Sequence, residues 1–122
     1  MLQLKSFDPS HPIDQQLGVA QSPVVLINTF VVDAADAEAL LKAWQTDANW
    51  MKRQPGFIST QLHKAVGGNA MFLNYAVWES VGHFREAFTH PEFRASLAAY
   101  PDSAVASPHL FERLTMPNLC VA

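Results

Sequence analysis

The chain has 122 residues, of which 49% are hydrophobic and 16% charged, and its formal net charge is −3. A chain of this size folds as one globular domain that buries roughly two-thirds of its unfolded surface. The weak acidic charge, without any cluster of Lys or Arg, argues against binding to nucleic acid or to an anionic membrane, so a small organic molecule is the expected partner.

The cysteine content and the lack of long apolar segments indicate the expected compartment. The single cysteine, Cys120, excludes an intramolecular disulfide and a CxxC metal site. No stretch approaches the ~20 apolar residues of a membrane span, and no basic segment followed by an apolar stretch begins the chain. We therefore expect a cytoplasmic protein without a metal site.

The first segment, residues 1–22, carries the weakest periodicity of the chain. Residues 8–12, with the sequence Asp-Pro-Ser-His-Pro, are typical of turns, and Gly18 would break a helix that began earlier. We expect an N-terminal arm here rather than a domain of its own.

A β-branched run over residues 24–32 predicts a buried strand, introduced by Pro23. Asn28 interrupts this run and, because side chains alternate across a strand, shares a face with Leu26 and Phe30. A buried amide needs a hydrogen-bond partner. That partner is either structural or a ligand.

The next segment has the 3.6-residue period of a helix, which Asp33 is placed to cap and Pro55-Gly56 to end. Its apolar positions are Ala37, Leu40, Leu41, Trp44, Ala48 and Met51.

Residues 57–65 and 70–78 predict two strands of a hairpin around a turn at residues 67–69. On the second strand Phe72, Asn74, Ala76 and Trp78 share one face, and Leu73, Tyr75 and Val77 share the other. Both faces are largely apolar, so we expect helices to cover one and a partner subunit the other.

Ser80 is placed to cap a short helix, and Pro91 to begin another that Pro101 closes. A loop rich in Ser, Ala and Pro then leads to a last strand, expected over residues 110–114. The resulting order, β-α-β-β-α-α-β with an antiparallel sheet, describes an α+β ferredoxin-like sandwich.

Three motifs carry a resemblance to a known family: Pro55-Gly56-Phe57, the segment Asn74-Tyr75-Ala76-Val77-Trp78-Glu79-Ser80, and His90-Pro91-Glu92-Phe93-Arg94. Together they resemble the antibiotic biosynthesis monooxygenase family over residues 23–115, leaving residues 1–22 as an arm and residues 116–122 as a C-terminal tail. The resemblance implies a homodimer in which two sheets face each other as a dimeric α/β barrel, with a pocket between each sheet and its own helices.

Within that family, members that oxidise anthrones with O2 and no cofactor contact the substrate through an Asn, a Trp and a later Arg. Asn74, Trp78 and Arg94 are similar to these, whereas Phe84 stands where those enzymes have a tyrosine. Haem-degrading members pair an Asn on the first strand, which Asn28 matches, with a Trp and an axial His on the later helices. By sequence spacing, the positions that correspond to this Trp and His fall near Ala87 and Leu97. Because no axial histidine stands there, haem breakdown is not expected.

Cofactor-free oxygenation needs few protein groups, because an acidic, electron-rich phenol or anthrone can lose a proton and pass an electron to O2 by itself. We name Asn74, Trp78 and His63 as candidate catalytic residues. His63, on the predicted strand over residues 57–65, is a candidate general base, and His83, on the short helix, is the other candidate for that role. The candidate substrate-binding residues are Asn28, Phe72, Phe84 and Arg94.

Each candidate also has a structural explanation: Trp78 as a core or interface anchor, Arg94 as the partner of a surface Glu, and His63 as an ordinary strand residue. The leading hypothesis is a cofactor-independent monooxygenase that acts on a small aromatic phenol, quinol or anthrone. The alternatives are a non-catalytic dimeric module that binds a small molecule, and an isomerase of a small phosphorylated ketone.

Overall fold

The computed structural model describes residues 1–120. Its elements follow in the order β1 (Gln3–Leu4), α1 (Ile13–Gln16), β2 (Val24–Val31), the 3-10 turn η1 (Ala34–Asp36), α2 (Ala37–Met51), β3 (Phe57–Lys64), β4 (Met71–Trp78), α3 (Val81–Phe88), α4 (Pro91–Ser96), the 3-10 turn η2 (Leu97–Ala99) and β5 (Val105–Phe111). From β2 to β5 this is the predicted β-α-β-β-α-α-β order.

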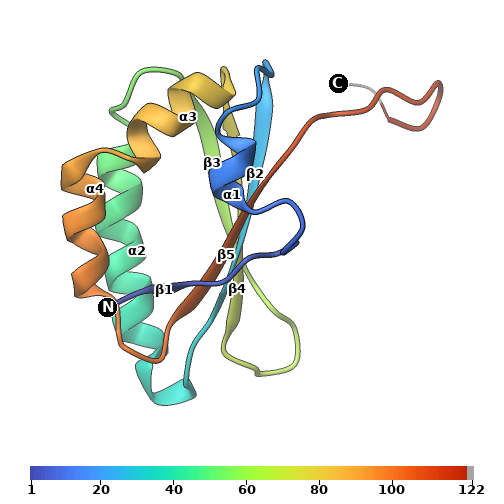
Figure 1. The fold of residues 1–122 in the computed structure, drawn as a ribbon. Helices are drawn as coiled ribbons and strands as arrows, with labels where there is room; N and C mark the ends of the chain where they lie inside the picture. Colours follow the sequence, from blue (N-terminus) through green and yellow to red (C-terminus); the bar gives the residue numbers. More distant parts are fainter. Residues whose placement is uncertain (121–122) are drawn as a thin grey trace.

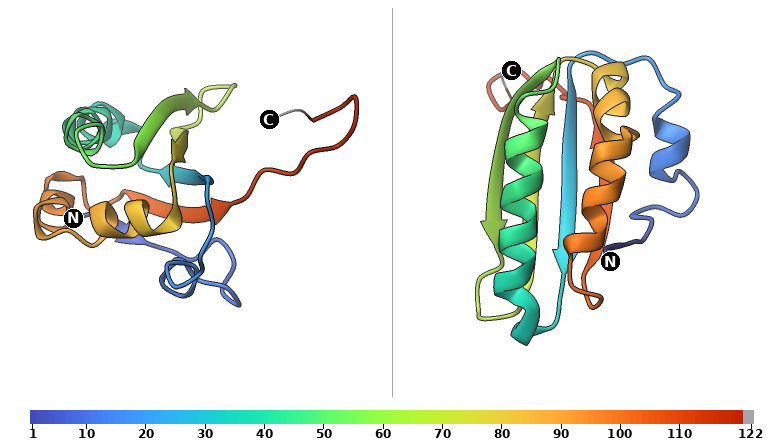
Figure 2. Two further views of the ribbon diagram at one scale, coloured as in Figure 1. Left: turned by 90° about the horizontal axis from the view of Figure 1, so that it is seen from above. Right: turned by 90° about the vertical axis from the view of Figure 1, so that its left-hand side faces the viewer.

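The five strands form one sheet in the order β1-β5-β2-β4-β3. Helices α2, α3 and α4 lie together on one of its faces, which confirms the ferredoxin-like α+β sandwich (Figures 1 and 2). The pairs among β2, β3, β4 and β5 are antiparallel as predicted, and β1, a strand that the sequence did not predict, joins β5 in parallel and makes the sheet mixed. Within one chain the sheet stays open and does not close into a barrel.

Strand β4 lies between β2 and the edge strand β3. The predicted division of its faces is confirmed: Phe72, Asn74, Ala76 and Trp78 are all buried beneath the helices. On the other face Tyr75 is 39% exposed. One face of β4 therefore belongs to the core of this chain, and the other is partly open.

Ser80, Asp33 and Gly56 stand at three points where the sequence predicts that a helix begins or ends. The Ser80 side chain accepts a hydrogen bond from the backbone N–H of His83, as predicted for the cap of α3. The expected cap at Asp33 was wrong, since its side chain accepts no such bond and the chain first makes η1. At Gly56 φ is +87°, and an added Cβ would lie 2.3 Å from the ring of His83, so only glycine fits this turn.

The N-terminal arm contains regular structure that its sequence does not indicate. Strand β1 pairs with β5, and the backbone N–H of Lys5 donates to the carbonyl of Ala106. Farther along β5, the side-chain amide of Gln16 donates to the carbonyl of Leu110 and accepts from its N–H. The arm is therefore fastened to β5 at two points.

The last strand runs over Val105–Phe111 instead of the predicted residues 110–114. Pro108 in its middle obscured it, because proline cannot donate to a sheet ladder. The neighbours Ala106 and Leu110 direct their backbone groups outward to the arm, so Pro108, two residues from each, also points its nitrogen away from β2. The missing N–H therefore leaves the β2–β5 pairing intact.

Beyond Phe111 the chain leaves the domain on the side opposite the helices (Figures 1 and 2). Leu114 and Leu119 are 66% and 84% exposed in this segment. The expected tail began at residue 116, and its last two residues, 121 and 122, lie outside the described part. No helix within residues 1–120 has the length and apolar character needed to cross a membrane.

Candidate functional site

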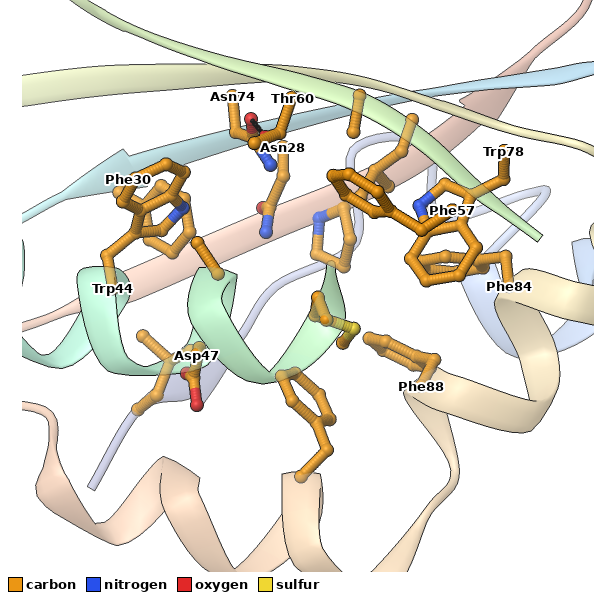
Figure 3. A pocket seen from close by; sticks show the side chains of 17 residues that line it. Asn28, Phe30, Trp44, Asp47, Phe57, Thr60, Asn74, Trp78, Phe84 and Phe88 are labelled. Atoms are coloured by element: carbon orange, nitrogen blue, oxygen red, sulfur yellow. Dashed lines mark hydrogen bonds between the residues drawn. The ribbon is translucent and has the colours of Figure 1, made fainter. Parts of the chain in front are cut away.

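A small cavity of about 70 Å³ lies between the inner face of the sheet and the helices. Figure 3 shows its lining, which is mainly aromatic and aliphatic with a few polar side chains. Among the residues that the structure describes, none that lines it is a Lys, Arg or His. The lining residues are Leu2, Leu26, Asn28, Phe30, Trp44, Asp47, Ala48, Met51, Phe57, Thr60, Asn74, Ala76, Trp78, Phe84, Phe88, Phe93 and Pro108.

Two amides form the polar centre on the sheet side. Asn28 and Asn74 are directly opposite each other in the β2–β4 register, and both side chains face the cavity (Figure 3). Opposed residues on one face of an antiparallel pair have Cβ atoms roughly 4.5–5.5 Å apart, so the two amides are neighbours. A single small polar group of a ligand can therefore reach both.

Thr60 orients one of these amides. Its hydroxyl donates to Oδ1 of Asn74 from the adjacent strand β3. That bond occupies the amide oxygen, while Nδ2 makes no hydrogen bond within residues 1–120 and stays available as a donor. Oδ1 of Asn28, in contrast, is a buried acceptor without a partner. The pair thus offers a ligand one donor and one acceptor, and a buried acceptor without a partner, such as Oδ1 of Asn28, is uncommon in proteins.

An aromatic wall closes the end of the cavity near α3. The Trp78 ring packs edge-to-face against Phe57 and Phe84 at centroid distances of 5.4 and 5.7 Å, and Phe84 stacks on Phe88 at 5.1 Å. Trp78 is only 2% exposed, yet it lines the cavity, so it anchors the core and faces the site together. Phe84 offers a hydrophobic ring at this wall and no hydroxyl.

The helix side contributes a carboxyl that the sequence analysis missed. Asp47 on α2 is 7% exposed and lines the cavity, and its Oδ2 has no hydrogen-bond partner within the described chain. Burial raises the pKa of this carboxyl, and the nearby hydroxyls of Ser96 and Tyr100 oppose the rise. The spacing of Leu40, Trp44 and Asp47 puts an acidic residue within the apolar stripe of the helix. This interruption of the apolar stripe is the sequence signal that could have identified Asp47.

The structure brings some of the predicted site residues together at the cavity and places others elsewhere. Asn28, Asn74, Trp78 and Phe84 line the cavity together. Phe72 shares the inner face but belongs to the core beside Phe30, outside the lining.

The two remaining candidates lie away from the cavity. His63 is exposed on β3, paired with Leu73 on the opposite face of the sheet, where its Nδ1 lies 3.3 Å from the Leu73 carbonyl oxygen. The guanidinium of Arg94 stacks over the ring of the lining residue Phe88, 4.5 Å from its centroid, but Arg94 itself does not line the cavity.

This arrangement favours a flat, mainly apolar ligand that carries oxygen. Aromatic rings supply contact area, and the amides of Asn28 and Asn74 have the chemistry to accept a hydrogen bond from one ligand group and to donate to another. The cavity is smaller than the roughly 300 Å³ at the lower end of ligand pockets. A ligand of two or three rings therefore requires side chains such as Trp44 and Phe93 to move outward.

The sequence also matches known proteins across most of its length. A family model described as antibiotic biosynthesis monooxygenase matches residues 23–99. Deoxynogalonate monooxygenase from Streptomyces nogalater is 30% identical over 102 residues, which are 83% of this chain and 86% of that protein.

Solved structures agree with this match. SnoaB, a cofactor-independent oxygenase from Streptomyces nogalater, is similar with a TM-score of 0.71 and 26% identity, over 80% of this chain and 100% of the other. A protein from Shewanella loihica gives a TM-score of 0.67 and 32% identity, over 81% of this chain and 100% of the other.

Proposed function

The chain belongs to the antibiotic biosynthesis monooxygenase family, and we propose that it is a cofactor-independent monooxygenase that oxidises a small aromatic phenol, quinol or anthrone with O2. Two relatives support this reaction class: one is named deoxynogalonate monooxygenase and the other is described as a cofactor-independent oxygenase. In such a reaction one oxygen atom enters the substrate and the other leaves as water.

The observation that carries the proposal is the pair of opposed amides in an aromatic cavity, in which the buried Oδ1 of Asn28 has no partner. The Nδ2 donor of Asn74 supports the oxygen on which negative charge develops when the substrate loses a proton. The Oδ1 acceptor of Asn28 receives a neighbouring substrate hydroxyl. The substrate anion then supplies the electrons that O2 requires, so the protein has only to favour and hold that anion.

Trp78 has two roles in this proposal. Its indole N–H is a second donor for the substrate oxygen, and its ring, with Phe57 and Phe84, keeps that end of the cavity apolar. Exclusion of water strengthens the hydrogen bonds to the anion, because they act in a medium of low dielectric constant.

The lining of the cavity also bears on the two alternatives. An isomerase of phosphorylated ketones needs a cation that holds the phosphate, and the lining within residues 1–120 has none. A purely binding module needs no titratable group near Asn74, whereas Asp47 shares this cavity. The geometry therefore favours a proton-transferring enzyme over both.

We also propose that the protein is a homodimer through the outer face of its sheet. Val31, Tyr75 and Phe111 are 52%, 39% and 43% exposed on that face. A second copy would bury these side chains and leave each cavity on the far side of its own sheet.

The test of the function is oxygen uptake and quinone absorbance when metal-free protein receives a simple hydroxyanthrone. We expect turnover above the spontaneous rate, and a fall of tenfold or more in Asn74→Ala and Asn28→Ala, about 1.4 kcal/mol of transition-state stabilisation each. His63→Ala is the matched control, because His63 faces away from the cavity. Turnover that is absent, or that falls equally in all three variants, would contradict the proposal.

A further inference from the structure

We propose that Asp47 is the general base that removes the substrate proton, a step that rests on the proposed oxygenase function. The proton donor is a carbon or oxygen acid of the anthrone or phenol class. Asp47 lines the cavity from helix α2, with its carboxylate on the side of that helix turned toward α4, and the two amides line it from the sheet (Figure 3).

The hydroxyls near Asp47 offset its burial only in part. A carboxyl that is 7% exposed is normally paired with a cation or hydrogen-bonded at both oxygens. No Lys, Arg or His within residues 1–120 forms a salt bridge with it, and its Oδ2 is unpartnered. An acceptor left open beside a cavity is what a proton-transfer step requires.

The surroundings of Asp47 suit a base. The groups that act on its ionisation are the hydroxyls of Ser96 in α4 and Tyr100 after η2, both across from α2. They favour the carboxylate, while burial raises its pKa more strongly. In turn, burial and the Asp47 charge raise the pKa of Tyr100 and keep the phenol neutral. A carboxylate with a raised pKa accepts a proton more readily than an exposed one.

The proposed step is a simple proton transfer. A C–H or O–H bond of the substrate breaks, its electron pair remains on the substrate as the anion, and an O–H bond forms on the Asp47 carboxylate. Oxidation by O2 follows as a separate step. The proton leaves Asp47 with the water that is released, which returns the carboxylate for the next turnover.

Proton removal can be measured without oxygen, which separates this inference from the proposed function. Hydroxyanthrone is incubated with the protein in D2O under anaerobic conditions, and deuterium entry at its methylene carbon is followed by NMR. We expect the wild type to accelerate exchange, with a rate that rises with pH as Asp47 loses its proton. Asp47→Asn should lower the enzymatic part by a hundredfold or more, within the usual range for a general base.

Glu38→Gln is the matched control, because Glu38 is an exposed acid on the same helix. It should exchange as the wild type does. Asp47→Glu keeps a carboxylate and should retain more exchange than Asp47→Asn, and formate should restore part of the rate to Asp47→Ala. These last two variants keep the test decisive if Asp47→Asn folds poorly.

Several outcomes would overturn the role of Asp47: no acceleration by the wild type, unchanged exchange in Asp47→Asn, or an Asp47→Asn rate that keeps the pH dependence of the wild type. Exchange that depends on Asp47 but is followed by no oxygen uptake would refute the oxygenase and leave the base in place. Oxygen uptake that is indifferent to Asp47 would refute the base alone.

Discussion

Replacing Thr60 with valine tests whether the amide of Asn74 is held in place from the neighbouring strand. Valine has nearly the shape of threonine and suits a strand, so the cavity keeps its form. The change removes the hydroxyl that donates to Oδ1 of Asn74. That buried oxygen then lacks a partner, which costs about 1–3 kcal/mol in the free energy of unfolding.

The same loss should reach the reaction. Without the Thr60 hydroxyl the Asn74 amide is free to turn over, and its Nδ2 donor no longer points steadily to the substrate oxygen. We expect turnover to fall about tenfold, which corresponds to about 1.4 kcal/mol. Thr60→Ser is the matched control, because it keeps the hydroxyl and loses only a methyl group.

Urea unfolding measures the stability change, and quinone formation from hydroxyanthrone measures turnover. A double-mutant cycle with Asn74→Ala decides the cause. If Thr60 acts through Asn74, Thr60→Val has little further effect once the amide is gone. Full activity in Thr60→Val, or additive losses in the double variant, would refute this reasoning.

Three other predictions concern separate parts of the molecule. Trp78→Phe keeps an aromatic ring beside Phe57 and Phe84 but loses the indole N–H, so turnover should fall tenfold or more while the melting temperature changes little. Trp78→Ala removes the ring as well and should lower the free energy of unfolding by about 3–5 kcal/mol, measured by urea unfolding. Folding raises the pKa of the Asp47 carboxyl above its usual 3.8, so the folded state binds the proton more tightly than the unfolded state. The resulting contribution to the free energy of unfolding is complete below pH 3.8 and is lost as pH rises through the folded-state pKa. The stability of the wild type relative to Asp47→Asn should therefore decline from acid to neutral pH in paired urea titrations, and a constant difference would contradict the raised pKa. Tyr75→Lys on the outer face should shift sedimentation from dimer to monomer, whereas Glu38→Lys, an exposed substitution on helix α2, should not. A wild-type monomer at micromolar concentration would contradict the dimer.

The sequence predicted those parts of the fold whose signal is local. The alternation around Asn74 and Trp78 identified the inner face of β4, and Ser80 marked the start of α3. Strand β1 has only two residues and owes its structure to pairing with β5 about a hundred positions away, so no local pattern indicates it.

The site was predicted in part for the same reason. Asn28 and Asn74 interrupt apolar strands and are visible as exceptions to a pattern. Asp47 and Thr60 are ordinary residue types in a helix and an edge strand, and their roles depend on which side chains the packing places opposite them. His63 and Arg94 have the right chemistry for the reaction, yet His63 lies on the outer face of the sheet, and Arg94 stacks on the lining residue Phe88 without lining the cavity itself.

The attachment of the N-terminal arm to β5 has a consequence for solubility. An unpaired strand edge is a template on which other chains can add, and it promotes aggregation. Strand β1 and the Gln16 amide occupy that edge of β5, while the opposite edge, β3, carries polar residues such as Lys64 and an irregularity near Phe57. A protein shortened to begin at residue 23 would lose Leu2 from the lining of the cavity and would expose the β5 edge, and we expect it to form intermolecular β-sheet on storage.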